Sequence, residues 1–255
     1  EMGTRTRLDC ALGTSGLMRQ ALSLALHHAR ERQAFGRPLV QHALMRNVLS
    51  DLALESEAST ALSLRLSRAF DRQDDPFEAL MRRVLTPVAK FWICKRGSGF
   101  AQEAMECLGG NGYVEESGEG VMARIYREMP VNSIWEGAGN IMALDLLRVL
   151  QRAGPDVADA MAAELEPLAG ASAACDAARA GLLGRLRAAT DEHDGRRLAQ
   201  DLALAVQGAL LRRHAPDFVF EAFVASRVGT ASGLTYGGLP SSIDFDRLLQ
   251  RAAPA

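Results

Sequence analysis

Long segments in which apolar residues recur at helical spacing are the feature that most constrains the fold of this chain. Each segment ends where helix-breaking residues gather: Gly36 and Pro38, then Asp74 to Pro76, then the glycines of Gly109–Gly112. The predicted long helices cover residues 8–32, 41–70, 77–108 and 138–152. Four long helices joined by short links predict an all-α, up-down four-helix bundle.

Two further stretches depart from this regular pattern. Residues 113–133 hold a run of acids and glycines followed by a proline, and we predict irregular structure there. Gly154 and Pro155 then mark a shift in composition towards alanine. The predicted domains are a four-helix bundle over residues 1–153 and a smaller helical extension over residues 154–255. Within the extension we expect helices near residues 156–189, 196–214 and 217–228, and a loop over 229–242.

Composition supports the same fold class and excludes several functions. Apolar residues make up 48% of the 255 and aromatic residues 5%, which favours packed helices over sheet. The net charge of −2 does not indicate a polyanion binder. Four scattered cysteines predict buried, reduced thiols and no metal site. No apolar run has the roughly 20 residues of a membrane span, and no signal peptide is evident, so we expect a cytoplasmic protein without a membrane partner.

The most informative short motif surrounds Glu136. This carboxylate lies between Trp135 and a glycine-containing turn, Gly137 to Asn140, that opens the fourth predicted helix. Such a turn presents backbone N–H groups to an anion. The motif by itself also fits a simpler interpretation, in which a glutamate near a helix start interacts favourably with the helix dipole.

Two other motifs each allow two interpretations. Arg32 and Phe35 follow the first helix, where an arginine grips a phosphate or simply stabilises the last helical turn. Gly109 and Gly110 permit close approach of the backbone to a ligand, or only end the third helix. This glycine run follows no strand, so it does not indicate a doubly wound dinucleotide-binding fold.

Taken together, these motifs resemble the helical C-terminal domain of the acyl-CoA dehydrogenase family in order and spacing. The resemblance covers about residues 4–152. Its motifs are Thr6-Arg7, Arg32-Gln33-Ala34-Phe35-Gly36, Leu108-Gly109-Gly110-Asn111-Gly112-Tyr113, Tyr126-Arg127-Glu128 and Trp135-Glu136-Gly137.

The resemblance implies an FAD-dependent oxidoreductase that acts on an acyl-CoA-type substrate. Glu136 matches the carboxylate that removes the α-proton while FAD takes a hydride from the β-carbon, and Arg7 is expected on the substrate side. The positions implied to contact FAD of a neighbouring subunit are Arg32, Phe35, Gly109 and Gly110. The positions implied to contact FAD of the same subunit are Trp135, Gly137, Gly139 and Asn140. A homo-oligomer, expected to be a tetramer with shared FAD sites, follows from this arrangement.

Several departures from the family pattern qualify this expectation. Thr6 stands where one branch of the family carries its base, so Glu136 is left as the expected base. Bulky Trp135 narrows the expected acyl pocket, and Ala138 replaces the usual threonine. The family's N-terminal helical domain and middle β domain have no counterpart in the sequence, which begins at Glu1 without an initiator Met. We therefore expect a truncated chain that is inactive alone and binds FAD poorly.

Two alternative functions remain open. Thr6-Arg7-Leu8-Asp9-Cys10, Arg127 to Gly137 and Leu144 to Arg148 resemble a longer subgroup of the family that protects DNA during alkylation stress. DNA is the partner in this alternative, although residues 151–255 carry 11 basic and 13 acidic side chains. In the other alternative the redox site has decayed, and the helices serve only to build an oligomer.

Overall fold

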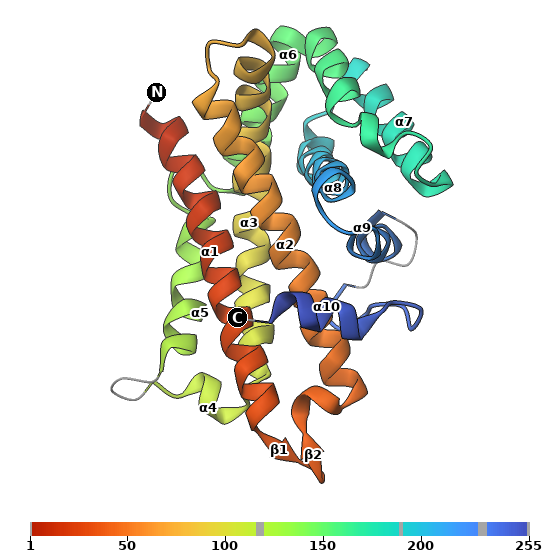
Figure 1. The fold of residues 1–255 in the computed structure, drawn as a ribbon. Helices are drawn as coiled ribbons and strands as arrows, with labels where there is room; N and C mark the ends of the chain where they lie inside the picture. Colours follow the sequence, from red (N-terminus) through yellow and green to blue (C-terminus); the bar gives the residue numbers. More distant parts are fainter. Residues whose placement is uncertain (1, 116–119, 189–190, 229–233, 254–255) are drawn as a thin grey trace.

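The computed structural model describes residues 2–115, 120–188, 191–228 and 234–253, and within them the chain is almost entirely helical (Figure 1). The longer helices are α1 (Met2–Glu31), α2 (Ala43–Asp71), α3 (Pro76–Glu106), α5 (Val121–Asn132), α6 (Gly139–Glu164), α7 (Ala173–Arg187) and α8 (Gly195–His214). The shorter elements are β1 (Gln33–Ala34), β2 (Arg37–Pro38), η1 (Leu39–Gln41), α4 (Gly110–Tyr113), η2 (Glu166–Leu168), η3 (Glu192–Asp194), α9 (Asp217–Phe223), η4 (Val224–Val228) and α10 (Phe245–Ala252).

The bundle is built on α1, α2 and α3, which run alternately along its length and pack against one another (Figure 1). The fourth position is shared, because α5 packs against α1 and α3 and α6 then continues along α3. The all-α bundle predicted from helical periodicity is confirmed. The helix starts also follow local chemistry: Asp75 caps α3 by accepting a hydrogen bond from the N–H of Phe77 at 2.8 Å.

The prediction that residues 113–133 are irregular is wrong over α5. Met122, Ile125 and Met129 recur at spacings of three and four residues and are buried against the bundle. Pro130 lies only two residues before the helix ends. The neighbouring acids and glycines concealed a short amphipathic helix; residues 116–119 of that predicted segment lie outside the described residues.

The break expected at Gly154 and Pro155 is a kink inside α6. Ala153 leaves helical geometry (φ −144°, ψ 34°), and the helix then continues to Glu164. Pro155 is tolerated because it lies in the first turn after the kink, where its missing N–H has no helical partner to lose. No helix ends at residue 153, and the division of the chain into two domains at this residue remains a prediction.

The C-terminal segments lie against the bundle. Helix α8 packs on α2, α3 and α6. Helix α10, which was not predicted from the sequence, packs on α2. Buried apolar side chains form one continuous core from Ala11 to Ala252. Of the predicted loop at 229–242, residues 229–233 lie outside the described residues, and residues 234–242 form turns and irregular backbone. None of the helices in the described ranges is both long and apolar enough to cross a membrane.

Candidate active site

The turn between α5 and α6 holds Glu136 in an unusual backbone conformation. Glu136 has φ of +57° and Gly137 has φ of +106°. Positive φ suits glycine but costs a glutamate on the order of 1–2 kcal/mol. In the described part of the chain, the only other non-glycine residue with positive φ is Phe35. Tertiary contacts must therefore hold the turn in place.

Two cations provide those contacts by binding three successive carbonyl groups. The ammonium of Lys90, on α3, donates to Trp135 O at 2.8 Å and to Gly137 O at 2.6 Å. The guanidinium of Arg7, on α1, donates to Glu136 O at 2.9 Å and also to Asp145 Oδ2, on α6, at 2.8 Å. We call these contacts the carbonyl clamp. The clamp ties the backbone of the turn to α1, α3 and α6.

Lys90 is the residue of this site that sequence reasoning missed. Its side chain is 1% exposed, and this burial lowers the pKa of its ammonium below the ordinary value. The sequence did contain a signal: Lys90 is one of only two lysines among 29 basic residues, and it follows an apolar run. A lone lysine between apolar neighbours on a buried helix indicates a charge with a dedicated partner.

The Glu136 side chain is exposed at the edge of a cavity of about 570 Å³ between α1 and α5. A Cβ placed on Gly3 would lie 3.6 Å from Glu136 Oε2, so the carboxylate lies beside the start of α1. The cavity is lined by Thr6, Asp9, Cys10, Gly13, Gly16, Leu17, Glu128, Asn132, Trp135 and Glu136. The carboxylate therefore faces a hollow large enough for a small ligand.

Two glycines of the turn have internal packing reasons. Gly137 needs its positive φ, and a Cβ there would lie 2.8 Å from Met142 Cε. A Cβ on Gly139 would lie 2.9 Å from Lys95 Cε of α3. The sequence interpretation attributed these small residues to a ligand, and the structure adds that the fold itself requires them.

The C-terminal extension (residues 154–255), called the tail below, also reaches this site. Arg196, on α8, donates to the side-chain oxygen of Asn140 at 3.0 Å and lies over the ring of Phe91 at 5.5 Å from its centroid. Asn140 was expected to contact a cofactor in the same subunit, and in this structure its carboxamide oxygen already has a protein partner. Its amide NH₂ group is the remaining donor for a ligand.

A second group of predicted site residues lies at the far end of the bundle, around the β1–β2 hairpin and α4 (Figure 1). Phe35 and Gly36 are the two central residues of the hairpin turn, both at positive φ, and the Phe35 side chain is 94% exposed. Arg32, Gly109 and Gly110 are exposed nearby. Close packing in this region requires a glycine at position 112, since a Cβ there would lie 2.3 Å from Met105 O.

The two groups cannot meet within one chain. Arg7 and Arg32 are 25 residues apart along and just beyond α1. At a rise of about 1.5 Å per residue, that separation is roughly 37 Å. The structure thus brings Arg7, Trp135, Gly137, Gly139 and Asn140 around Glu136. It leaves Arg32, Phe35, Gly109 and Gly110 as a separate group.

Exposed apolar side chains gather at the same two places. Four lie at the hairpin end, namely Phe35, Leu44, Tyr113 and Val114, and four lie at the Glu136 turn, namely Val131, Ile134, Trp135 and Ile141. Among the described residues, the other large exposed apolar side chains are Leu64 and Leu234. Clusters of exposed apolar side chains mark sites that bind a ligand or another protein surface, and both groups of predicted site residues have such a cluster.

Comparison with known proteins matches residues 3–151 to the family model described as acyl-CoA dehydrogenase, C-terminal domain. The putative acyl-CoA dehydrogenase AidB of Escherichia coli is 46% identical over 250 residues, which are 98% of this chain and 45% of that protein. The chain therefore spans less than half the length of this relative.

Solved structures show the same fold. Caenorhabditis elegans ACDH-11 in complex with C11-CoA aligns with a TM-score of 0.73 at 24% identity, over 99% of this chain and 42% of that one. An acyl-CoA dehydrogenase from Bacillus anthracis complexed with FAD aligns with a TM-score of 0.66 at 17% identity, over 87% of this chain and 46% of that one.

Proposed function

Because the chain belongs to the acyl-CoA dehydrogenase family through its C-terminal domain, we propose that it is the helical part of an FAD-dependent flavoprotein acting on acyl-CoA-type thioesters. The family is FAD-dependent. The solved relatives include one complexed with FAD and another in complex with C11-CoA. The complete site requires domains beyond this chain, so the chain alone is inactive.

Glu136 is the proposed base that removes the substrate's α-proton. When bound, FAD supplies an acceptor for the hydride that leaves the β-carbon. The observation that carries the proposal is the left-handed backbone of Glu136, held by Lys90 and Arg7 at the edge of a cavity. Backbone strain maintained by surrounding contacts is characteristic of functional sites. A fixed carboxylate is what proton abstraction requires.

The residues present fit a flat, extended, anionic cofactor shared between subunits. Trp135 is 53% exposed beside Glu136 and offers an aromatic surface, while the Asn140 amide remains a donor. At the hairpin end, Arg32 is exposed next to Phe35 and suits a phosphate. Since these groups are roughly 37 Å apart by the rise of α1, a shared site needs a second copy of the chain. A homotetramer is the proposed assembly.

The test of the base is Glu136→Gln in the complete protein, with α-proton exchange of an acyl-CoA measured by deuterium uptake. Exchange is expected to fall at least 100-fold, because a carboxamide does not accept the proton. Asp9→Asn is the matched control, since Asp9 lines the same cavity from α1. Exchange that persists in Glu136→Gln, or falls equally in both variants, contradicts the proposed role.

The isolated chain is expected to bind FAD weakly. Its two groups of predicted FAD contacts face outward without the domains that enclose a cofactor. Flavin absorbance of the purified chain after gel filtration measures this directly. Stoichiometric flavin retained by residues 1–255 contradicts the proposal that the chain is incomplete.

A DNA-associated role in the alkylation response is the second candidate, carried by the 46% identity over nearly the whole chain, tail included. The tail arginines offer limited support, because Arg197 pairs with Asp201 at 3.0 Å and Arg212 with Asp217 at 2.6 Å. DNA affinity that falls steeply between 50 and 200 mM salt, as expected for several phosphate contacts, identifies this role. Affinity independent of salt excludes it.

A further inference from the structure

A second cavity of the described structure lies away from the Glu136 site. It has a volume of about 720 Å³, is open to solvent on one side and is lined by residues of α1, α2, α8 and α10. None of the proposed site residues lines it. Its size falls within the range of small-molecule sites, roughly 300–1,000 Å³. Binding of a ligand in this cavity would therefore be independent of the proposed dehydrogenase site.

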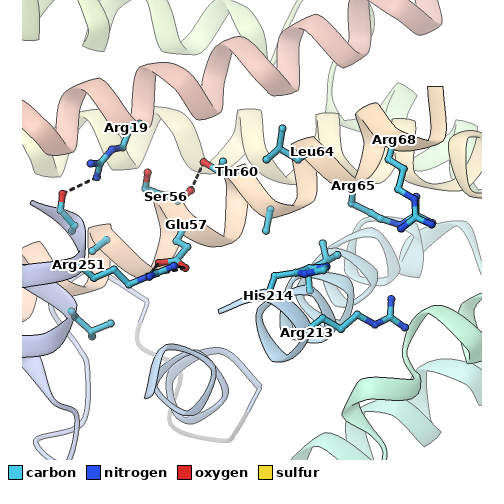
Figure 2. Close-up of a pocket in the computed structure, with 15 residues that line it drawn as sticks. Arg19, Ser56, Glu57, Thr60, Leu64, Arg65, Arg68, Arg213, His214 and Arg251 are labelled. Atoms are coloured by element: carbon cyan, nitrogen blue, oxygen red, sulfur yellow. Dashed lines mark hydrogen bonds and ion pairs between the residues drawn. The ribbon is translucent and has the colours of Figure 1, made fainter. Parts of the chain in front are cut away.

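The cavity combines an apolar floor with cations at both ends. Figure 2 shows Arg65, Arg68 and Arg213 at one end, Arg19 and Arg251 at the other, and Leu64 between them. The apolar lining consists of Ala53, Ala61, Leu64, Leu210, Leu248 and Ala252. The Leu64 side chain is 60% exposed and presents apolar surface to the cavity. An apolar strip between charged ends suits an amphipathic ligand.

The charges around the cavity do not balance. The carboxylates that pair with its arginines are Glu57 with Arg251, and the buried Glu78 and Glu164 with Arg65 and Arg68. Five arginines thus face three carboxylates. In the part of the chain that the structure describes, Arg19 is hydrogen-bonded only to the carbonyl of Ala252, at 2.8 Å. For Arg213, no hydrogen-bond or ion-pair partner is found within the described ranges.

We propose that this cavity binds a straight-chain aliphatic molecule with an anionic headgroup, of which a fatty carboxylate is the representative. The headgroup lies between Arg68 and Arg213, where two guanidinium groups offer paired N–H donors. The chain runs along Leu64, Ala61 and Leu210. A nucleic-acid backbone fits less well, because its phosphates need a continuous cationic surface and leave an apolar hollow unfilled.

The test is displacement of a fluorescent fatty-acid probe from the full chain by decanoate, dodecanoate and dodecanol below their micelle concentrations. One site per chain is expected. Affinity should rise about fourfold for each added methylene. Dodecanol should bind at least tenfold more weakly than dodecanoate, because it lacks the charge.

Variants localise the site. Arg213→Leu is expected to weaken dodecanoate about tenfold or more, and Leu64→Ser to reduce the dependence on chain length. Arg212→Leu is the matched control, because Arg212 is the adjacent residue of α8, loses the same charge and does not line the cavity. Binding unaffected by Arg213→Leu, or weakened equally by both arginine variants, overturns the proposal. So does displacement of the probe by a short DNA duplex at concentrations where dodecanoate fails.

Discussion

At the scale of single residues, Lys90 holds the Glu136 turn from outside the motif. Lys90 is buried and binds the carbonyls on either side of Glu136. A backbone conformation unfavourable for glutamate persists because breaking these contacts would leave both carbonyls without a donor. Lys90 therefore acts as a positioning residue for Glu136.

Replacing Lys90 by Met should lower the free energy of unfolding by about 2–4 kcal/mol, because two carbonyls lose a charged donor. Urea denaturation measures the change. Lys95→Met on the same helix is the control, since Lys95 is exposed and makes no hydrogen bond or ion pair within the described part of the chain. Equal destabilisation by the two variants would show that the carbonyl clamp is not the cause.

Burial of Cys94 predicts a dependence of stability on pH. Burial raises the pKa of the Cys94 thiol from 9.0 to about 11. Between these values the folded thiol keeps its proton while the unfolded thiol loses it. The contribution of Cys94 to the free energy of unfolding is therefore fully present below pH 9 and falls as the pH rises towards 11. The fall is about 1.4 kcal/mol per pH unit for one such group. The free energy of unfolding, measured in urea at pH 8 and at pH 10.5, should fall less between the two pH values in Cys94→Ala than in the unmodified protein. An equal fall in both proteins would contradict this assignment.

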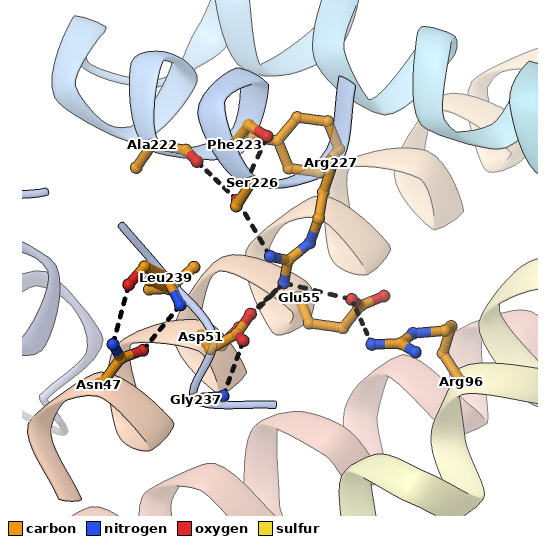
Figure 3. Close-up of polar contacts among 10 residues, drawn as sticks. All are labelled: Asn47, Asp51, Glu55, Arg96, Ala222, Phe223, Ser226, Arg227, Gly237 and Leu239. Carbon is orange, nitrogen blue, oxygen red and sulfur yellow. Dashed lines mark hydrogen bonds and ion pairs between the residues drawn. The ribbon is translucent and has the colours of Figure 1, made fainter. Parts of the chain in front are cut away.

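At the scale of elements, one face of α2 holds the C-terminal segments in place. Asn47, Asp51 and Glu55 recur every four residues, and Figure 3 shows them contacting the tail. Asn47 exchanges two hydrogen bonds with the backbone of Leu239, at 2.9 and 3.0 Å, and Asp51 accepts one from Gly237 N at 2.9 Å. Arg227, in η4, pairs with both carboxylates.

Replacing Arg227 by Met should destabilise the protein by about 3–5 kcal/mol, because Asp51 and Glu55 are 4% and 3% exposed. Among the described residues, Glu55 would keep only its ion pair with Arg96, and Asp51 would lose its ion-pair partner. Arg46→Met is the control, since its pair with Asp246 also joins α2 to the tail but is exposed and should contribute less than about 1 kcal/mol. Adding Asp51→Asn to Arg227→Met should restore part of the loss. Hydrogen exchange at Gly237 N and Leu239 N reports whether the tail detaches first.

At the scale of the whole molecule, the two groups of predicted site residues lie at separate ends of the bundle. Each coincides with a cluster of exposed apolar side chains. The simplest arrangement that completes both is a symmetric oligomer, in which the hairpin end of one copy covers the Glu136 turn of another or a cofactor beside it.

Subunit complementation tests this arrangement in the complete protein. Glu136→Gln and Arg32→Ala are each expected to be inactive, and their co-assembly should restore about a quarter of the sites if subunits mix at random. Restoration occurs only when Glu136 and Arg32 of one site come from different chains. Mixed oligomers without any activity would place both residues in the same chain's site.

The sequence by itself determined the helical class, the bounds of α2 and α3 to within two residues, and the position of the Glu-Gly turn. These features have local causes: apolar periodicity sets a helix, and glycine, proline or a capping aspartate ends it. Local signals also misled, since acids and glycines next to Val121–Asn132 concealed α5, and a proline suggested a boundary where α6 only kinks at Ala153.

Only the tertiary structure decided how the turn is held, where the tail lies and how far apart the two groups of site residues are. Lys90 is 45 residues from Trp135, and Arg227 is 176 from Asp51. A pattern of neighbouring residues contains no information about partners at such separations, because the pairing depends on how the helices pack. Burial then determines which of the chain's many arginines and carboxylates contribute substantially to stability and which remain solvated.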